Sequence, residues 1–563
     1  KVGGVTLTRP IDLLRQGRRE ELWQMCCGFI DLSLEQFMDI QKRLLLEQIE
    51  LLKNCELGRK VMRGAMPSTV EEFREQVPLT TYGDYLPELA EKREDVLPAK
   101  VARWVRTSGK TGEFDVKWVS LSEDFIRECE KLGGAVLLLS TCDSRGDTSK
   151  LKEHFKLLFS MGPPEYISGA LVQVTQSATG CDLLPKHGEG MPFQERLRAG
   201  FGEALYRGLD MVGGLPSALV AVGDQFARRS EKRNIRPLLS HPAALGRVIR
   251  AVVRSKLHHR SMLPKDMWSL KGIAGSGTDS GVFRKKVEEL WGRPLLEMYS
   301  ATEGGYFALQ TWDYDGMTFI PNLNFFEFIP EREWFKWQLD RSYQPKTVLL
   351  DEVKAGENYE IVITNFHGSP LVRYRVGDFI RITSLRNEKL GIDIPQMVFY
   401  SRADDLIDIA GLGRVTERII WEAIENSGIP YSDWTARKEM IGNKPALHIY
   451  LELKGDYIAS EQGVAAAIYE QFKELERQYE YNPYRTLFGD IETTLGLEPI
   501  QVTFLPQGAS FRYVSQRQAE GADLGHLKPP HINPSDKVLS LLRAPRVVVE
   551  AVPATEAERV ATR

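Results

Sequence analysis

Five short polar segments, spread from residue 107 to residue 528, carry the side chains that could do chemistry. The first, TSGKTG at residues 107–112, combines hydroxyl groups, glycines and a lysine at the predicted end of a strand. Backbone N–H groups and hydroxyls in such a loop can surround phosphate oxygens. A Walker A loop is excluded, because its first glycine would have to stand where Trp104 is. Taken alone, the segment could equally be a surface turn.

The second and third segments supply carboxylates. In YSATEGG at residues 299–305, an aromatic ring leaves a strand and Glu303 follows four residues later. The ring can cover an adenine face, and the carboxylate can hold Mg²⁺ against phosphate oxygens. In YRVGD at residues 374–378, Asp378 follows a glycine and can accept two hydrogen bonds from a ribose diol. A strand-end turn and a salt-bridged Arg–Asp turn are the plain alternatives.

The last two segments lie late in the chain. SRADD at residues 401–405 is a polar crossing between two predicted domains, where a rotating domain would need a hinge. An ordinary polar linker has the same composition. Lys528 stands before two prolines in HLKPP at residues 526–530. By itself it reads as a solvated loop lysine.

The order of these five segments resembles that of the superfamily of acyl-CoA synthetases, peptide-synthetase adenylation domains and luciferases. The resemblance is closest to its Gretchen Hagen branch, the acyl-acid amido synthetases first known as auxin-responsive plant proteins. It extends to FREQVPLTTYGDY at residues 73–85, WSLKGIAGS at 268–276, PNLNFFEFIP at 321–330, and residues 508–530. The sequence departs from the family pattern at Lys110, where threonine or serine is usual, at the position of Lys117, and at His531, where plant members have arginine.

The resemblance implies ATP and Mg²⁺ as cofactors and assigns residues to them. Glu303 and Lys528 are the implied catalytic residues: Glu303 as the magnesium ligand, Lys528 as a bridge between the acyl carboxylate and the phosphate. The implied nucleotide contacts are Ser108, Gly109, Thr111 and Gly112 at the phosphates, Gly275, Ser276, Tyr299 and Thr302 around the adenine and its strand-end turn, and Asp378 at the ribose. Arg402 is implied to reach the ribose or the phosphate after domain rotation. Phe307 and Phe325, with residues 211–216, are candidate walls of the acid pocket, for which simple core is the more common alternative.

The implied reaction is the ATP-dependent activation of a carboxylic acid as an acyl-adenylate, followed by transfer to an amine, most simply an amino acid. AMP and pyrophosphate would be released. An acyl-CoA ligase that uses the CoA thiol as acceptor is the alternative within catalysis. A relative without catalytic activity that binds acid or nucleotide is the alternative from another class.

Two predicted domains position these segments. From about residue 104 to 400, short β-branched runs alternate with amphipathic stretches, which is typical of an α/β domain. Strands are predicted at residues 135–140, 295–299, 322–330, 360–364 and 379–383, and helices after Ser33 and at 282–290. A helix at 416–426, strands at 446–453 and 501–505, and a helix over 464–475 predict a small α+β domain. The expected division is residues 1–402 for the large adenylating domain with the ATP and acid sites, 403–545 for a small mobile domain that carries Lys528, and 546–563 for a flexible tail.

Composition limits the partners and the compartment. The net charge of −4 argues against a protein whose main task is to grip nucleic acid. The six cysteines have no framework spacing, which favours reduced thiols in a cytoplasmic enzyme. No apolar run reaches the roughly 18–20 residues that span a bilayer. We therefore expect a cytoplasmic protein that meets small acids and amines but neither nucleic acid nor membrane, and that is a monomer or a homodimer.

Overall fold

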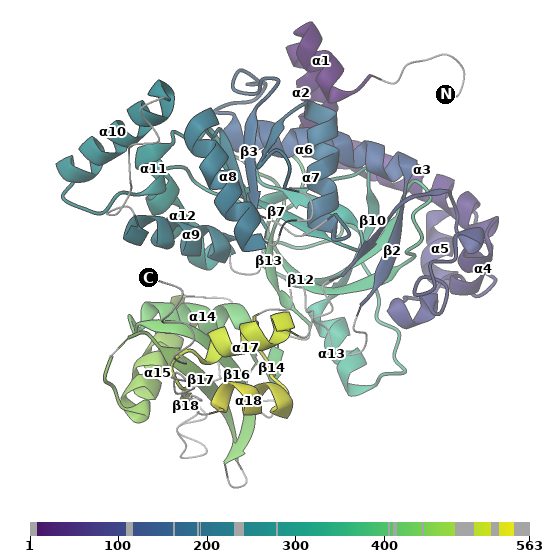
Figure 1. Cartoon of the computed structure of the whole chain (residues 1–563). Coiled ribbons are helices and arrows are strands. Elements are labelled where there is room, and N and C mark those ends of the chain that lie inside the picture. Colours follow the sequence, from purple (N-terminus) through teal and green to yellow (C-terminus); the bar gives the residue numbers. More distant parts are fainter. Residues whose placement is uncertain are drawn as a thin grey trace, which may run out of the picture. The chain divides into compact units, whose positions relative to one another are not determined.

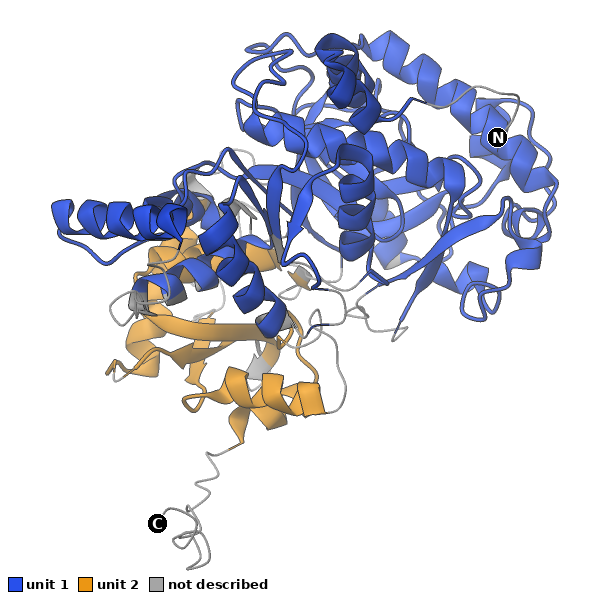
Figure 2. Cartoon of the chain, turned by 45° about the horizontal axis from the view of Figure 1, so that its top comes forward, with its two compact units in different colours: residues 1–404 blue, residues 405–563 orange. Residues whose placement is uncertain are grey.

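The computed structural model describes residues 8–107, 116–160, 164–188, 191, 193–229, 241–276, 280–403, 406–408, 414–441, 444–455, 457–478, 500–519 and 528–544. The chain divides into two compact units, residues 1–404 and 405–563, coloured separately in Figure 2. This division lies two residues from the predicted junction at 402/403. The first unit is α/β and the second is α+β, which is the predicted fold class.

Eleven of the described strands form one mixed sheet in the first unit, in the order β10-β11-β12-β13-β9-β8-β7-β6-β5-β3-β4 (Figure 1). Neighbouring strands from β4 to β7 run parallel, whereas those from β7 to β10 run antiparallel. Their bounds are β3 Lys156–Ser160, β4 Asp182–Leu184, β5 Met211–Gly214, β6 Gly272–Gly275, β7 Leu296–Ala301, β8 Gly305–Leu309, β9 Met317–Phe319, β10 Asn324–Pro330, β11 Asn358–Asn365, β12 Tyr374–Ser384 and β13 Gln396–Arg402. A separate antiparallel pair joins β1 Val101–Arg106 to β2 Trp118–Ser122.

Helices cover both faces of the parallel half of this sheet. Successive residues of one strand enter different cores: Leu157 lies in one and Leu158 in the other. The Leu157 core is closed by α1 Pro10–Gln16, α2 Arg19–Cys27, α3 Leu34–Lys53, α6 Glu123–Thr141 and α7 Ile167–Thr179. The Leu158 core is closed by α8 Phe193–Arg207, α9 Pro216–Arg229, α10 Pro242–Leu257, α11 Pro264–Met267 and α12 Ser280–Trp291. The other α-helices in the described part of this unit are α4 Glu56–Val61, α5 Val70–Gln76 and α13 Glu331–Leu339.

The prediction of a buried strand at residues 135–140 was wrong. These residues are the last part of helix α6, where every residue from Leu132 to Thr141 is buried. A helix that is covered on all sides loses the polar stripe of an amphipathic helix, so its sequence reads as a continuous apolar run. Such a run cannot be told from a buried strand by periodicity alone.

Helix α3 is joined to the antiparallel half of the sheet by two buried glutamines. The helix begins with the predicted capping box of Ser33 and Gln36. Further along, Gln41 donates from Nε2 to the carbonyl oxygens of Pro321 and Asn324, at 2.6 and 2.7 Å. Gln48 accepts from the N–H of Gly368 at 2.8 Å. Because these side chains saturate backbone groups that strand pairing leaves free, α3 fixes the loops beside β10 and β12.

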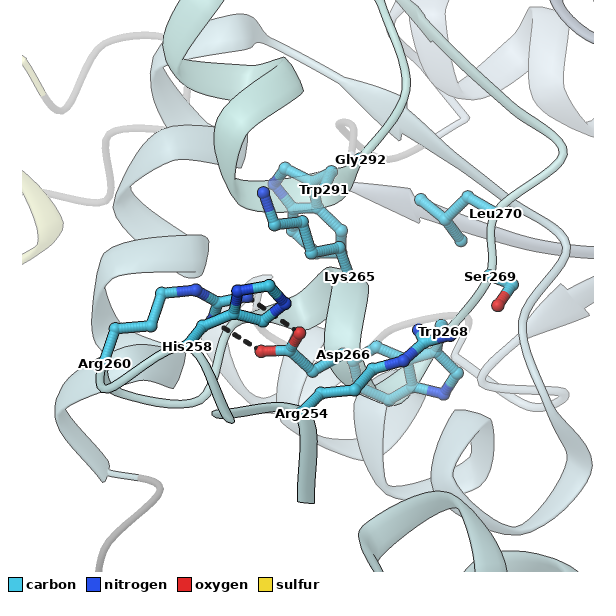
Figure 3. A pocket seen from close by; sticks show the side chains of 10 residues that line it. All are labelled: Arg254, His258, Arg260, Lys265, Asp266, Trp268, Ser269, Leu270, Trp291 and Gly292. Carbon is cyan, nitrogen blue, oxygen red and sulfur yellow. Dashed lines mark hydrogen bonds and ion pairs between the residues drawn. The ribbon is translucent and has the colours of Figure 1, made fainter. Parts of the chain in front are cut away.

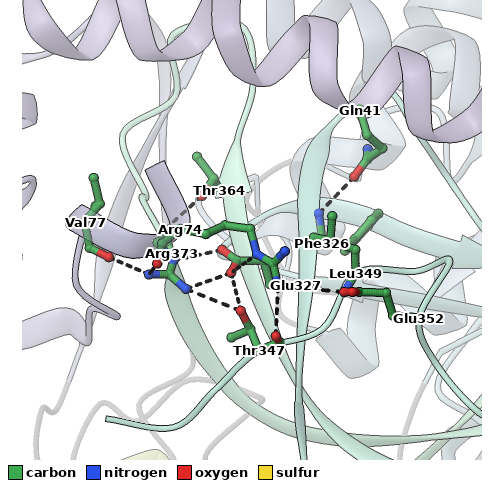
Figure 4. A network of polar contacts seen from close by, with 10 residues as sticks. All are labelled: Gln41, Arg74, Val77, Phe326, Glu327, Thr347, Leu349, Glu352, Thr364 and Arg373. Atoms are coloured by element: carbon green, nitrogen blue, oxygen red, sulfur yellow. Dashed lines mark hydrogen bonds and ion pairs between the residues drawn. The ribbon is translucent and has the colours of Figure 1, made fainter. Parts of the chain in front are cut away.

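A buried ion pair between Glu327 on β10 and Arg373 secures the same half of the sheet (Figure 4). The guanidinium donates to both carboxylate oxygens, at 2.8 and 2.9 Å, and the two side chains are 1% and 7% exposed. Arg373 also donates at 2.7 Å to the carbonyl of Arg74, at α5. Burial favours the neutral form of Glu327, but the charge of Arg373 outweighs this and lowers the carboxyl pKa.

The second unit is built on a three-stranded sheet. β16 Tyr431–Ile441 pairs antiparallel with β17 Lys444–Leu453, which pairs parallel with β18 Ile500–Phe504. A short pair, β14 Leu406–Asp408 and β15 Arg414–Thr416, precedes it. The helices in the described part of this unit are α14 Glu417–Asn426, α15 Glu461–Gln478, α17 Ala509–Ala519 and α18 Asp536–Arg543. Thr416 caps α14, as predicted, by accepting from the N–H of Ile419. Within the described residues of both units, no helix is long and apolar enough to cross a bilayer.

Candidate active site

The carboxyl ends of parallel strands β5, β6 and β7 form the edge at which several predicted site residues gather. Gly275 closes β6 and pairs with Gly214 of β5. A Cβ atom on Gly275 would come within 2.6 Å of the Gly214 carbonyl oxygen, so only glycine allows this close approach. Half-exposed Ser276 follows it. The carboxyl edge of a parallel sheet is where α/β proteins bind nucleotides.

The turn between β7 and β8 presents Glu303. Its backbone carbonyl accepts a 2.9 Å hydrogen bond from the amide of Asn365. The next carbonyl, of Gly304, accepts from Asn324 at 2.8 Å, and the two asparagines bond each other at 2.8 Å. A Cβ atom on Gly304 would lie 2.3 Å from the ring of Phe307. Two buried amides and one required glycine therefore fix the backbone under Glu303 and the half-exposed Thr302.

A bulge in β12 presents Asp378. Arg375 pairs with Val362 of β11, but the next described partners are Phe379 and Glu360, so β12 has extra residues between them. Gly377 lies in this bulge with φ +80°, a conformation that favours glycine. A bulge turns a side chain out of the regular alternation of a strand, and bulges are frequent beside active sites. The Asp378 side chain therefore departs from the regular alternation of β12, although the Asp378 backbone still belongs to the strand.

Tyr299, Asp378 and Arg402 form a connected group. The Tyr299 hydroxyl donates to Oδ2 of Asp378 at 2.8 Å, and the Arg402 guanidinium lies 3.6 Å from Oδ1. Burial, followed by the charge of Asp378, raises the pKa of Tyr299 well above its ordinary value, so the phenol remains a donor. Its ring meets Phe307 edge-on at 4.9 Å.

Glu303 belongs to the same group electrostatically. Burial raises its carboxyl pKa; the charge of Lys117 is the largest opposing influence, Asp378 raises the pKa further, and Arg402 lowers it. Lys117 lies 5.9 Å from the ring centre of Tyr82. Two carboxylates and two cations from four separate segments therefore lie within electrostatic reach of one another. A carboxyl group with a raised pKa beside a lysine in such a cluster is typical of a functional site.

The structure describes the residues on either side of the predicted phosphate loop. Ser108, Gly109, Thr111 and Gly112, together with Lys110, lie outside the described residues. The strands on either side, β1 and β2, pair up to Arg106 and Trp118, and the N–H of Thr107 donates to the Lys117 carbonyl at 2.9 Å. The described residues on either side of this segment therefore lie next to Lys117, whose charge acts on Glu303.

The chemistry of the donor set suits a magnesium ion that is shared with a phosphate ligand. Among the residues that the structure describes, no three His, Cys, Asp or Glu side chains gather as a protein-only metal site. Glu303 is one carboxylate near a second, Asp378. Magnesium is commonly held by one or two carboxylates plus substrate phosphates, so these residues fit Mg²⁺ with a nucleotide better than a resident metal.

A cavity of about 40 Å³ lies against β7 and β8, and two of its lining residues, Met298 and Ser300, flank Tyr299 in the sequence. Apolar side chains of β3, α6, α7 and β5 line most of it, and Met298, Ser300 and Tyr306 close it on the β7–β8 side. Phe307 and Phe325, predicted as walls of an acid pocket, are both fully buried in the core and neither lines this cavity. Since Tyr306 lines it, its neighbour Phe307 faces the other side of β8. Met211 and Gly213, from the predicted segment 211–216, do line it.

A larger cavity of about 480 Å³ lies elsewhere in the first unit, between α10, α11 and the end of α12 (Figure 3). Arg254, His258 and Lys265 line it, and Arg260 is held at 2.7 and 2.9 Å by Asp266. None of the predicted site residues that the structure describes lines this cavity. The size of a cavity therefore does not identify the candidate active site in this protein. The polar group around Glu303 identifies it better.

Lys528 belongs to the second unit, where it is exposed. It lies close enough to Asp433 for its charge to contribute to lowering the carboxyl pKa, against the effect of burial. Sequence reasoning missed Asn324, Asn365 and Tyr82. A polar amide inside the apolar runs of β10 and β11 was the available signal for the two asparagines.

Comparison with known proteins gives a family. Residues 26–154 match the model of the GH3 family N-terminal domain, and residues 317–402 match that of the GH3 family central domain. A jasmonoyl–L-amino acid synthetase, JAR4 of Nicotiana attenuata, is 35% identical over 150 residues, 25% of this chain and 23% of that protein. The 4-substituted benzoates-glutamate ligase GH3.12 of Arabidopsis thaliana is 27% identical over 241 residues, 40% of this chain and 38% of that protein. The chain thus spans less than half the length of these curated relatives.

Solved structures give the fold over the whole chain. The acyl acid amido synthetase AtGH3.15, in complex with 2,4-DB, superposes with a TM-score of 0.65 at 17% identity, covering 96% of this chain and 97% of that one. A 2-hydroxyisobutyryl-CoA ligase in the postadenylation state superposes with a TM-score of 0.58 at 15% identity, covering 93% of each. At these identities the superpositions establish the adenylate-forming fold. Two GH3 family models match in order along the chain, so residues 26–154 and 317–402 are similar to the N-terminal and central domains of the GH3 family, the Gretchen Hagen branch that its motifs resemble.

Proposed function

We propose that this protein is a ligase that activates a carboxylic acid with ATP and transfers the acyl group to an amine, most simply an amino acid. The observation that carries the proposal is the group formed by Tyr299, Glu303, Asp378 and Arg402, with Lys117 beside it. Its place at the carboxyl edge of the parallel strands favours a nucleotide as its ligand. The named activities of the curated relatives, a jasmonoyl–L-amino acid synthetase and a 4-substituted benzoates-glutamate ligase, support the same reaction.

In the first half-reaction, an oxygen of the acid attacks the α-phosphorus of ATP. A P–O bond forms, the bond to the β-phosphate oxygen breaks, and pyrophosphate leaves. Asp378 would accept hydrogen bonds from the ribose, Tyr299 would lie against the adenine, and residues 108–112 would surround the phosphates. Mg²⁺ held by Glu303 would neutralise phosphate charge. The ammonium group of Lys528 would bridge the carboxylate and the α-phosphate, which orients the two anions for attack.

In the second half-reaction, the amine attacks the acyl carbonyl, the carbonyl–O bond to AMP breaks, and a proton leaves the nitrogen. AMP leaves readily, whereas the free acid would have had to expel oxide. The two steps need different surroundings, which a small domain that turns about residues 403–405 would supply. The expected mobility of the second unit remains part of this proposal.

The cavity beside β7 supports a compact acid with an uncharged body. No charged side chain is among its lining residues, which include Leu137, Leu171, Met211 and Met298. A second carboxylate or an ammonium on the acid would lose hydration there without a partner. At about 40 Å³, the space suits a small apolar group.

Acid-dependent exchange of labelled pyrophosphate into ATP tests the activation step. We expect exchange with one or more uncharged monocarboxylic acids, and loss of exchange in Glu303→Gln. Absence of exchange with every acid, in protein that still binds nucleotide, would make it a binding relative without catalysis. Adding amino acids or CoA to the active pair and identifying the product by mass then decides between an amide and a thioester.

A further inference from the structure

His531 is held between two carboxylates in the second unit. Its Nδ1 lies 2.6 Å from Oε1 of Glu417, the first residue of α14, and its Nε2 lies 3.0 Å from Oδ1 of Asp433 on β16. A neutral imidazole has one donor and one acceptor nitrogen, whereas both of these nitrogens face acceptors. The geometry therefore requires the doubly protonated ring. Burial alone would lower the pKa of His531, but hydrogen bonds to Asp433 and Glu417 raise it to about 9.

Two tryptophans enclose the ring. Trp434 stacks on it at 4.4 Å with an interplanar angle of 11°, and Trp421 meets it edge-on at 4.6 Å. The His531 side chain is only 9% exposed. An imidazolium over an indole face gains a cation–π interaction, which is stronger when water is excluded. The ring is thus fixed on four sides.

The backbone on either side of His531 is attached to β16. The N–H of Ala436 donates to the His531 carbonyl at 2.6 Å, and the N–H of Asn533 donates back to the Ala436 carbonyl at 2.8 Å. The hydroxyl of Thr435 donates to the Pro530 carbonyl at 2.6 Å. Residues 530–533 therefore lie along β16 like a short added strand.

A stiff link joins this attachment to Lys528. Only Pro529 and Pro530 stand between the two side chains. Each proline fixes its own φ, and a residue before proline is confined to extended conformations. The attachment of His531 to β16 therefore restricts where the backbone can place Lys528. The two cations also share a neighbour, because Asp433 bonds His531 and feels the charge of Lys528.

We propose that His531 is a positioning residue for Lys528: its imidazolium occupies Asp433 and Glu417, so that the Lys528 ammonium group is held by its backbone and left available to the acyl carboxylate and phosphate. This inference rests on the function proposed above. Without the imidazolium, Asp433 would lose the cation that it bonds, while the charge of Lys528 still reaches it. The ammonium would be drawn into an ion pair with Asp433, away from the reaction.

Single-turnover kinetics of the full chain test this role with four variants. His531→Gln should slow adenylation by about tenfold or more, while transfer from preformed acyl-adenylate changes by less than about twofold. His531→Arg, which keeps a cation able to reach both carboxylates, should restore most of the adenylation rate. Asp433→Asn added to His531→Gln should also restore it in part, because the competing carboxylate is gone. His448→Gln is the matched control: His448 also bonds a carboxylate, Glu439 at 2.7 Å, and stacks on an aromatic ring, Tyr450 at 4.3 Å.

Equal slowing of both half-reactions by His531→Gln, or no slowing, in protein of unchanged melting temperature would overturn the inference. So would an equal effect of His448→Gln. A readout without turnover separates this failure from that of the proposed function: labelling by an amine-reactive reagent, followed by peptide mapping. We expect His531→Gln to change the labelling rate of Lys528 at constant labelling of the exposed Lys537, whether or not any acid supports exchange. Unchanged labelling of Lys528 contradicts the inference, whereas absent exchange in the parent protein contradicts only the proposed function.

Discussion

The hydroxyl of Tyr299 donates a 2.8 Å hydrogen bond to the carboxylate of Asp378, although three strands lie between theirs in the order of the sheet. The antiparallel half of the sheet must curve to bring β7 and β12 together. The bond links the end of β7 to the bulge of β12, two of the predicted nucleotide segments. In the proposed complex, the ribose would meet an acceptor that Tyr299 and Arg402 already orient.

Asp378→Asn should weaken the binding of AMP by about tenfold or more. An amide offers one acceptor oxygen and no charge, and hydrogen bonds to charged groups contribute roughly 1.5–3 kcal/mol. Isothermal titration calorimetry with AMP measures the effect. Asp340→Asn is the control, because Asp340 is a carboxylate of the same unit that accepts a hydrogen bond from Ser342. Equal affinities for the two variants would remove Asp378 from the nucleotide site.

Glu303→Gln should raise the melting temperature at pH 8 while it abolishes exchange. Burial raises the Glu303 pKa above its ordinary value of 4.5, so the fold prefers the neutral carboxyl group. The stability contributed by this preference is present below the ordinary pKa and is lost as the pH rises through the raised value. The variant should therefore gain over the parent at pH 8 and much less at pH 5. Scanning fluorimetry at both pH values measures this, and a loss of stability at pH 8 would contradict it.

The predicted site residues differ in how far sequence could place them. Gly275, Tyr299, Glu303 and Asp378 stand at strand ends or beside glycines, where side-chain type and position indicate a ligand. The bulge that sets the direction of the Asp378 side chain depends on how β11 and β12 pair. The periodicity of a single segment does not predict which residues pair across two strands. The α/β and α+β units followed from alternating runs, which report local burial directly.

Sequence reasoning failed where burial is complete. The run at residues 135–140 reads alike as strand or helix, and only its packing against α2 and α7 decides for α6. For Phe307 and Phe325, the sequence left both a pocket wall and simple core open, and both side chains are fully buried. An aromatic residue next to a site motif can face a pocket or the core, and which face of β8 is the core depends on the whole sheet.

Met298→Ala should shift acid preference towards larger acids. Met298 lines the cavity of about 40 Å³ and is only half-buried, so its removal enlarges the space for substrate. One methylene in a hydrophobic pocket changes transition-state binding by roughly 1–3 kcal/mol, so kcat/KM for an acid longer by one or two carbons should rise about tenfold relative to the parent's best acid. Met397→Ala, at a fully buried position that does not line the cavity, should lower stability without this shift. An unchanged order of acids in Met298→Ala would place the acid elsewhere.

The His531 cluster should make the second unit less stable at high pH. The pKa of His531 is raised from 6.5 to about 9, so the stability that the ring contributes to the fold is complete below pH 6.5 and is lost as the pH rises through about 9. The ionised partners of the ring are Glu417 and Asp433, and Lys528 lies near Asp433. Because the pKa of Asp433 is lowered, the stability that Asp433 contributes is lost at acid pH instead. Urea unfolding of the parent and His531→Gln should differ most near pH 6 and converge near pH 10. A constant difference across this range would mean that the ring is neutral in the fold.

Arg373→Leu should destabilise the first unit strongly, and the loss should shrink when Glu327 is replaced as well. Removing one partner of a buried ion pair leaves an uncompensated charge, which costs roughly 3–5 kcal/mol, whereas an apolar replacement of both partners can be nearly neutral. Among the residues that the structure describes, Glu327 would retain contacts to Thr347, at 2.6 Å, and Arg74, at 3.6 Å. Because Arg373 lowers the pKa of Glu327, the pair stabilises the fold above the ordinary carboxyl pKa of 4.5 and loses this contribution as the pH falls. A double-mutant cycle by urea unfolding at pH 7 and pH 4.5 measures both effects. Additive losses from Arg373→Leu and Glu327→Leu would show that the two side chains act independently, which the bidentate contact in Figure 4 opposes.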